Sequence, residues 1–277
     1  METRQWEHAG LTIEGCSLAG IQTSLTLPQY SIALDVANGL PHAISMNTFF
    51  ISHGHMDHAA GIPYIISQKA MRAHKKPRFY MPESMLAPME EIMHQWGRIE
   101  GHEYDYEFIG ARLGEEYEIK KNIFMKPFPT IHRIPSFGYS LYRKFRKLRW
   151  DLAGSSTAEI ATVRKEGEDP TEERDELLVS FTGDTQIEFL DQTPEVRKSK
   201  ILILETTYLD KKKTIRSAKD WGHTHLEELL PRLNTISSEK IVLIHTSARY
   251  SWEEAQGLLH SLLPKNERER VMLFPRK

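Results

Sequence analysis

The sequence predicts an α/β fold, and three observations lead to this class. Three late segments each carry an apolar run of four to six residues that ends on polar residues: LLVSFTGDT at 177–185, KILILETTY at 200–208 and KIVLIHTSARY at 240–250. Such runs suit strands that are buried on both faces. Between the last two lies HLEELLPRLN at 225–234, whose leucines recur at helical spacing. No internal repeat of about 20–50 residues is present, which argues against a solenoid.

The earlier elements follow from alternating or apolar runs separated by turn residues. Strands are expected within 11–15, 20–27, 30–36, 47–52 and 78–81, and strand-like segments return at 103–110, 116–120 and 123–132. Helices are expected at 59–71, where Pro63 is tolerable in a first turn, and at 83–99, where Pro88 interrupts the pattern. The chain is therefore β-rich at first and mixed later.

Composition narrows the class of protein. The chain has 277 residues, 40% of them hydrophobic and 27% charged, which is ordinary for a globular protein with a core. No apolar run approaches the roughly 18–20 residues of a membrane span, and the start resembles no signal peptide, so we expect a cytoplasmic protein without a membrane partner. The single cysteine, Cys16, excludes an intramolecular disulfide and is expected to be a small buried side chain. A net charge of −2 gives no global attraction to nucleic acid.

One stretch departs from the rest of the chain. Residues 142–150, YRKFRKLRW, hold five basic residues and three aromatics, and residues 166–176, EGEDPTEERDE, hold seven acidic residues. This segregated block predicts an arm or lid inserted at about 142–176 into a single domain spanning 1–277. The basic segment suits phosphates and stacked bases, but an amphipathic surface helix explains it equally well.

A dense group of metal-binding side chains follows the apolar run at 47–52. His53, His55, Asp57 and His58 form the pattern H-x-H-x-D-H. Residues two apart on an extended backbone project to the same side, so His53 and His55 can face one ion together. The chain then bends toward the expected helix, which lets Asp57 and His58 face a second ion. Imidazole and carboxylate ligands suit zinc, and also manganese or iron.

Four ligands do not complete two metal sites, so further ligands are expected downstream. The candidates end apolar runs: His132 after FPTI, Asp184 in FTGDT and His245 after IVLI. Open α/β sheets build their sites at these strand ends. Taken alone, each residue is better explained by a core, surface or turn position, and it is the first motif that makes the three of them a set of candidate ligands.

These motifs together resemble the metallo-β-lactamase superfamily and, within it, most closely the ribonuclease Z (tRNA 3′-endonuclease) family. The matching segments are SHGHMDHAAGIPY at 52–64, TIHRIPSFGY at 130–139, FTGDT at 181–185, LETTYLD at 204–210, WGHTHLEE at 221–228 and IHTSARY at 244–250. The resemblance implies an αββα four-layer sandwich with two metal ions at one edge of its packed sheets.

The resemblance also implies a role for each site residue. His53, His55 and His132 would hold one zinc ion, Asp57, His58 and His245 would hold the other, and Asp184 would bridge them. A hydroxide between the ions would be the nucleophile, and Asp57 would orient it or take the proton of the water from which it forms. His223, its ring held by Glu205, would donate a proton to the leaving 3′-oxygen. His225 is a rival for the role of His223.

The expected substrate is a tRNA precursor cleaved on its 3′ side by a dinuclear zinc phosphodiesterase. The alternative is a metallo-hydrolase of the same fold that acts on a small phosphodiester, a thioester or a lactone. The family's tRNA-gripping arm occupies the position of residues 142–176, although its Gly- and Pro-rich tip is not visible here. The resemblance further implies a homodimer in which the arm of one subunit serves the site of the other.

Overall fold

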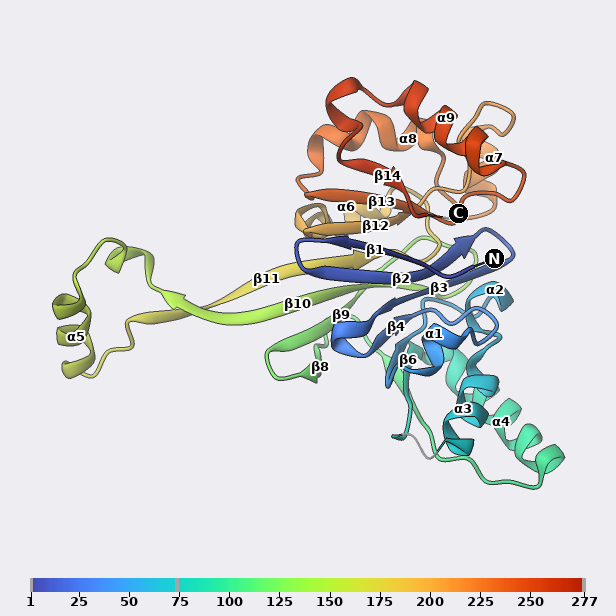
Figure 1. Cartoon of the computed structure of the whole chain (residues 1–277), viewed down its shortest axis with the longest axis horizontal. Helices are drawn as coiled ribbons and strands as arrows, with labels where there is room; N and C mark the ends of the chain where they lie inside the picture. The colour runs from blue at the N-terminus through green and yellow to red at the C-terminus, as the bar shows by residue number, and fades with distance from the viewer. Residues whose placement is uncertain (1, 73–74, 276–277) are drawn as a thin grey trace.

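The computed structural model describes residues 2–72 and 75–275, which form two seven-stranded sheets (Figure 1). The first sheet consists, in spatial order, of β1 (Arg4–His8), β2 (Leu11–Leu18), β3 (Gln22–Leu27), β4 (Ile32–Leu34), β5 (Thr48–Phe50), β6 (Arg78–Pro82) and β7 (Glu107–Ala111). The second consists of β14 (Val271–Leu273), β13 (Lys240–Ile244), β12 (Ile201–Glu205), β11 (Thr171–Phe181), β10 (Phe137–Leu148), β9 (Ile123–Pro129) and β8 (Tyr117–Lys120). Each sheet has an antiparallel half and a parallel half.

Helices cover the outer face of each sheet (Figure 1). The helices on the first sheet are α1 (Pro41–Ile44), α2 (Met56–Ala59), α3 (Ile62–Met71) and α4 (Leu86–Glu100), and those on the second are α6 (Phe189–Gln192), α7 (Ile215–Asp220), α8 (Leu226–Leu229) and α9 (Trp252–Leu262). Short 3₁₀ turns are η1 (Pro28–Tyr30), η2 (Glu83–Met85), η3 (Trp150–Leu152), η4 (Pro194–Lys198), η5 (Leu230–Thr235) and η6 (Lys265–Glu267). The predicted αββα sandwich is confirmed.

The core divides into three apolar clusters, one for each interface between layers. The central cluster joins the two sheets and includes Phe50 and Phe181, and the outer clusters join each sheet to its helices. Phe49 and Phe50 are neighbours in β5 yet belong to different clusters, because successive strand residues point to opposite faces. This is why the strands that carry the site read as continuous apolar runs.

Parallel strands bring the polar ends of these runs to one edge. The expected strands at 177–181, 201–205 and 240–244 are present as β11, β12 and β13, and β12 pairs in parallel with both of its neighbours. β4 and β5 are parallel in the first sheet as well. Carboxyl ends of strands from both sheets therefore meet at one edge of the sandwich.

The leucine-rich segment at 225–234 is not the single helix that its spacing predicts. It forms only four α-helical residues, in α8, and then continues as the 3₁₀ turn η5. Pro231 is the reason, because its ring has no N–H to donate and clashes with the carbonyl four residues earlier. The leucines Leu226, Leu229 and Leu233 are nevertheless buried against the second sheet.

Strands β10 and β11 extend beyond the sandwich as a two-stranded ribbon that carries α5 (Thr157–Lys165) at its tip (Figure 1). A register shift between Leu141 and Tyr142 lies where the pair leaves the sheet, and the pairing continues to Leu148 and Thr171. The alternative of a surface helix for residues 142–150 is wrong, because β10 runs through most of them. The description of residues 142–176 as an insertion into one domain stays a prediction.

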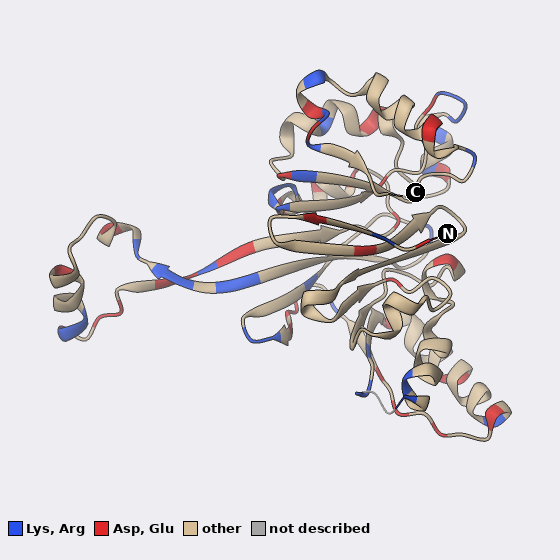
Figure 2. Cartoon of the chain, viewed as in Figure 1, with Lys and Arg blue, Asp and Glu red and all other residues tan. Residues whose placement is uncertain are grey.

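The ribbon places its basic strand directly beside its acidic strand (Figure 2). Cross-strand ion pairs are Arg143–Glu176, Lys144–Glu173, Arg146–Asp169 and Arg149–Glu168. These pairs are exposed to water and salt, which screen their charges, so they align the strands more than they stabilise the fold. The positive charge that the sequence suggested for RNA contact is therefore largely neutralised within the ribbon.

The single cysteine, Cys16, lies in the core. Cys16 is fully buried, and burial raises the pKa of its thiol to about 11, which keeps it protonated and inert. The expectation of a buried small side chain is confirmed.

Within the described residues, no helix has the length and apolar character needed to cross a membrane.

The close approach of two loops beside α3 permits a stability prediction. A Cβ atom at Gly61 would lie 2.0 Å from the backbone nitrogen of Gly39. We expect Gly61→Ala to lower the free energy of unfolding by about 1–3 kcal/mol, measured by urea denaturation. Gly257, exposed in α9 with open space around it, is the matched control. Gly257→Ala should stabilise by about 0.5–1 kcal/mol, and equal stability of the two variants would contradict the packing argument.

Candidate metal centre

The site lies where β5, the loop after β9, β11, β12 and β13 end. The chain leaves β5 through Ser52 and places His53 and His55 in an extended loop, and Asp57 and His58 follow in α2. Asp184 comes three residues after β11, and His245 comes directly after β13. The structure thus brings together all seven of the residues that the sequence suggested as ligands, in groups with ligand atoms within 4.8 Å of one another.

The first group consists of His53, His55, His132 and Asp184. Nδ1 of His55 lies 3.0 Å from Nε2 of His53 and 3.3 Å from Nε2 of His132. One carboxylate oxygen of Asp184, Oδ2, lies 3.6 Å from Nε2 of His53. Three imidazoles and one carboxylate therefore converge on a single point.

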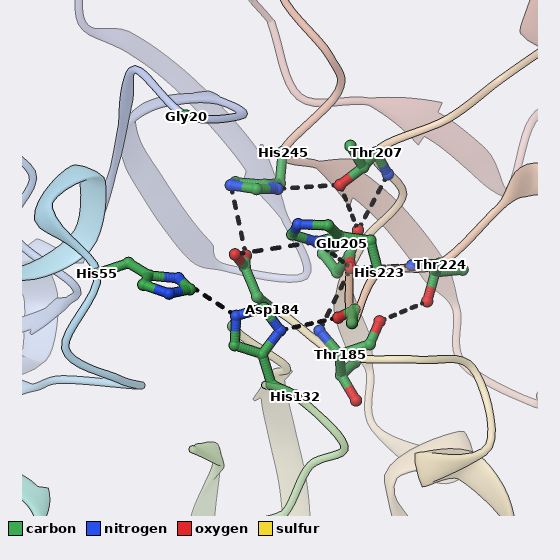
Figure 3. Close-up of polar contacts among 12 residues, drawn as sticks. Gly20, His55, His132, Asp184, Thr185, Glu205, Thr207, His223, Thr224 and His245 are labelled. Carbon is green, nitrogen blue, oxygen red and sulfur yellow. Dashed lines mark hydrogen bonds and ion pairs between the residues drawn. The ribbon is translucent and has the colours of Figure 1, made fainter. Parts of the chain in front are cut away.

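The second group consists of Asp57, His58 and His245, which the other oxygen of Asp184 joins. Nε2 of His58 lies 3.4 Å from Nε2 of His245, and Oδ2 of Asp57 lies within 3.4–3.5 Å of both. Oδ1 of Asp184 lies 3.5 Å from His58 and 3.4 Å from His245. Because its two oxygens face different groups, Asp184 is placed between them (Figure 3).

Hydrogen bonds fix which ring nitrogen of each histidine faces the centre. Four rings donate through Nδ1 to acceptors outside the cluster and so turn an unprotonated Nε2 inward. The pairs are His53 to Ser52 Oγ at 2.9 Å, His58 to Asp35 at 2.7 Å, His132 to the Gly222 carbonyl at 2.8 Å and His245 to Thr207 Oγ1 at 3.0 Å. The tautomers are therefore set as metal binding requires.

The donor atoms fit divalent ions in spacing and in chemistry. Ligand atoms about 2.0–2.1 Å from a tetrahedral zinc ion lie about 3.3–3.4 Å from one another, close to the separations above. Oδ1 of Asp184 is buried and has no hydrogen-bond partner. A buried polar atom without a partner costs about 1–3 kcal/mol, which a cation at this point would offset.

The protonation states of His53 and Asp184 also favour metal binding. Burial holds the pKa of His53 well below its usual range and keeps this imidazole neutral. Burial would raise the pKa of Asp184, but the positive charge that His245 and His58 can carry holds it well below the usual range, and Asp184 and Asp35 in turn raise the pKa of His58. A neutral His53 and an ionised Asp184 are the ligand forms that bind metal.

Backbone strain marks two strand ends at the centre. Asp35, just after β4, has φ of 54°, and His245 has φ of 57°. Side chains other than glycine adopt this left-handed region at a cost of about 1–3 kcal/mol. The turns aim Asp35 at His58 and His245 at Asp57 and Asp184.

A histidine–glutamate pair lies beside the two groups. Nδ1 of His223 is 3.0 Å from Oε1 of Glu205 and 3.9 Å from Oδ2 of Asp184. Glu205 is fully buried and also accepts hydrogen bonds from Thr224 N–H and from Thr207 (Figure 3). Burial opposes protonation of His223, but the charge of Glu205 prevails and raises the pKa of His223. The pair can hold a proton next to the centre.

The rival histidine, His225, is directed elsewhere. Its Nδ1 accepts the Glu227 N–H at 3.1 Å and caps α8, and its Nε2 donates to the Asp210 carbonyl at 3.0 Å. Both ring nitrogens are occupied, so of the two histidines only His223 faces the cluster.

Sequence reasoning missed the residues that orient the ligands. Asp35 hydrogen-bonds to His58 and also accepts both the N–H and the hydroxyl of Ser52. Asp35 ends the apolar run IAL, so the criterion that selected Asp184 and His245 also applies to it. The Gly20 N–H donates to Asp57 at 2.9 Å from a turn with no sequence signal of its own.

Comparisons with known proteins agree with this architecture. A family model described as a β-lactamase superfamily domain matches residues 42–246. tRNase Z TRZ1 of Arabidopsis thaliana is 34% identical over 260 residues, which are 93% of each chain. A ribonuclease Z of Methanococcus maripaludis is 28% identical over 232 residues, covering 75% of this chain and 71% of that protein.

Solved structures show the same fold at low sequence identity. The short form of human tRNase Z superposes with a TM-score of 0.62 at 16% identity and covers 94% of both chains. The metallo-β-lactamase fold protein YhfI of Bacillus subtilis gives 0.63 at 13% identity, covering 94% of this chain and 93% of that one. With the family match and the relatives in sequence, the resemblance suggested by the motifs is confirmed. The chain belongs to the metallo-β-lactamase superfamily and, within it, to the ribonuclease Z family of hydrolases.

Proposed function

We propose that the protein is a metal-dependent endoribonuclease that removes the 3′ extension of tRNA precursors. The observation that carries the proposal is the pairing of two convergent ligand groups with a buried Glu205–His223 dyad beside Asp184. Its relatives in sequence are named tRNase Z and ribonuclease Z, which supports RNA as the substrate. Ligands for two ions and a proton donor suit the hydrolysis of a phosphodiester.

Each residue has a role in this proposal. His53, His55 and His132 would hold one ion, Asp57, His58 and His245 the other, and Asp184 both. Zinc is the proposed metal, although manganese and iron accept the same ligands. When bound, the two ions supply Lewis acidity and lower the pKa of water to about 7.

The residues around the ions complete the chemistry. Asp57, held by the Gly20 N–H, orients the attacking water or takes its proton. His223 gives its proton to the leaving 3′-oxygen, and Glu205 acts as a positioning residue that holds the ring and favours its protonated form. Cleavage then leaves a hydroxyl on the tRNA and a phosphate on the released trailer.

A cleavage assay tests the function directly. The metal-loaded protein is incubated with a 3′-extended tRNA precursor and, separately, with bis(p-nitrophenyl) phosphate, and the RNA ends are mapped to the nucleotide. We expect one cut at the 3′ end of the tRNA, with mature tRNA left intact. Hydrolysis of the small ester alone would instead favour the small-substrate alternative, and inactivity of the metal-loaded protein on both substrates would reject a phosphodiesterase.

The ribbon leads away from the site, so the proposal gives it a role in holding the RNA body. Its two strands pair from Tyr139 and Phe181 outward, and the far end carries Trp150, which is 77% exposed. Because the ribbon pairs its own charges, the tip and α5 are the parts we expect to contact RNA. The homodimer implied by the resemblance stays a prediction.

Removing the ribbon tests this role. Replacing residues 143–175 with a short glycine turn should raise the KM for the precursor about tenfold or more, because phosphate and stacking contacts are lost. Hydrolysis of bis(p-nitrophenyl) phosphate should stay unchanged, since β9, β11 and β13 keep their site-proximal ends. If both substrates lose activity equally, the ribbon supports the fold and not the RNA.

A further inference from the structure

An exposed aromatic–cation pair lies next to the candidate metal centre. Trp221 follows α7, two residues before His223, and its indole is 54% exposed. Arg133 directly follows His132, and its guanidinium carbon lies 4.8 Å from the centroid of the Trp221 ring. The pair therefore joins the loop that carries a candidate ligand to the loop that carries the candidate proton donor.

The loop that carries the indole is held firmly against His132. The carbonyl of Gly222 accepts the hydrogen bond from His132 Nδ1 at 2.8 Å, and Gly222 has φ of 77°. A Cβ at Gly222 would lie 2.6 Å from that same nitrogen, so only glycine allows the approach. The N–H groups of Gly222 and His223 donate hydrogen bonds to the carbonyls of Lys219 and Ala218, which closes the turn. The backbone next to Trp221 is thus fixed relative to His132.

The charge of Arg133 is available to a ligand. Arg133 is exposed, and across residues 2–72 and 75–275 no carboxylate forms an ion pair with it, in contrast to the arginines of the ribbon. A guanidinium stacked on an indole keeps its in-plane N–H donors free and is planar enough to stack on a base. Its surroundings therefore suit a ligand that has both an aromatic ring and a negative charge.

We propose that Arg133 and Trp221 form a platform for an unpaired nucleobase of the RNA immediately flanking the scissile phosphate. The base stacks on the exposed surface of the pair, and the guanidinium contacts the adjoining backbone phosphate. The platform would hold the single-stranded end in register with the ions, independently of the distant ribbon. This inference rests on the proposed RNA cleavage.

A double-mutant cycle tests the platform, with one change in the protein and the other in the RNA substrate. The kcat/KM for cleavage of a precursor is measured for the wild type and for Trp221→Ala, with an abasic nucleotide placed on either side of the scissile phosphate. In the wild type, removing the stacked base should lower kcat/KM about 5- to 150-fold, the usual range for stacking. In Trp221→Ala, which has already lost the platform, the same abasic substitution should have almost no effect.

Two further variants separate stacking from folding. Trp221→Phe should restore most of the sensitivity to the abasic position, because a phenyl ring still stacks. Trp96→Ala removes a comparably exposed indole from α4 and should behave as wild type. Metal content should be equal in all of these proteins.

The outcomes are distinct. If Trp221→Ala and the abasic substitutions lower kcat/KM independently at both positions, so that their effects multiply, the platform is rejected. If the wild type cleaves no RNA while binding metal, the proposed function fails instead, before the platform is tested. Loss of metal in Trp221→Ala would assign the indole to the support of His132 and would likewise overturn the proposal.

Discussion

Asp184→Ala should remove most of the bound metal and lower kcat/KM for phosphodiester cleavage at least about a thousandfold. The two carboxylate oxygens face different ligand groups, so one substitution takes a ligand from both sites at once. Metal ions contribute several kcal/mol of transition-state stabilisation, which this variant should forfeit. The wild type should carry about two ions per chain, measured by plasma mass spectrometry after dialysis.

Asp191→Ala is the matched control for that change. Asp191 lies on the surface, in ion pairs with Arg197 and Arg232, and its loss should alter neither metal content nor activity. A wild-type protein that binds no metal would refute the whole assignment of the centre. If Asp184→Ala still holds two ions, Asp184 is not shared between the sites.

His223→Ala should lower turnover about 10²- to 10⁴-fold while leaving the metal content unchanged, because general acid catalysis contributes on this scale. Glu205→Gln keeps the size of the positioning residue but removes its charge, so it should reduce turnover less. Stopped-time cleavage assays and metal analysis on the same samples measure both quantities. His260→Ala, on the exposed face of α9, controls for the loss of an imidazole.

The metal measurement on His223→Ala is decisive for the role of this residue. His223 also forms a group with Asp184 and His245 whose geometry could hold an ion. If the variant loses metal, His223 is a ligand and the proton donor must be sought elsewhere. If it retains both turnover and metal, the Glu205–His223 pair is structural.

The sequence could predict the strands of the site because their apolar runs are long and end sharply. In β12, β13 and the part of β11 that lies in the sandwich, burial on both faces confines most polar residues to the strand ends, and Glu205 and His245 stand at or just after such ends. The helical spacing of the leucines at 225–234 predicted a longer helix than the structure has. Pro231 interrupts the backbone hydrogen bonds of a helix without altering the spacing of the apolar side chains. In so short a segment, one proline decides the backbone conformation more than the spacing of the leucines does.

Contacts between residues that are far apart in the sequence were harder to predict from the sequence. The basic and acidic blocks at 142–150 and 166–176 look like separate features in one dimension, and only antiparallel pairing shows that they neutralise one another. Likewise, Gly20 and Gly222 act through a backbone N–H and a backbone carbonyl, and not through a side chain that a motif could reveal. Their importance comes from position, which the side-chain pattern does not encode.

If the ribbon holds the RNA body as proposed, its length sets the distance between that body and the metal centre. Its strands pair from Tyr139 with Phe181 outward, so length can change at the far end while the base of the ribbon and Asp184 stay in place. Adding two residues to each strand would move the tip outward by about 6.6 Å, and adding one to each would turn its side chains to the opposite face. The distance between a held RNA body and the cut could therefore be set in steps, without any change to the metal centre.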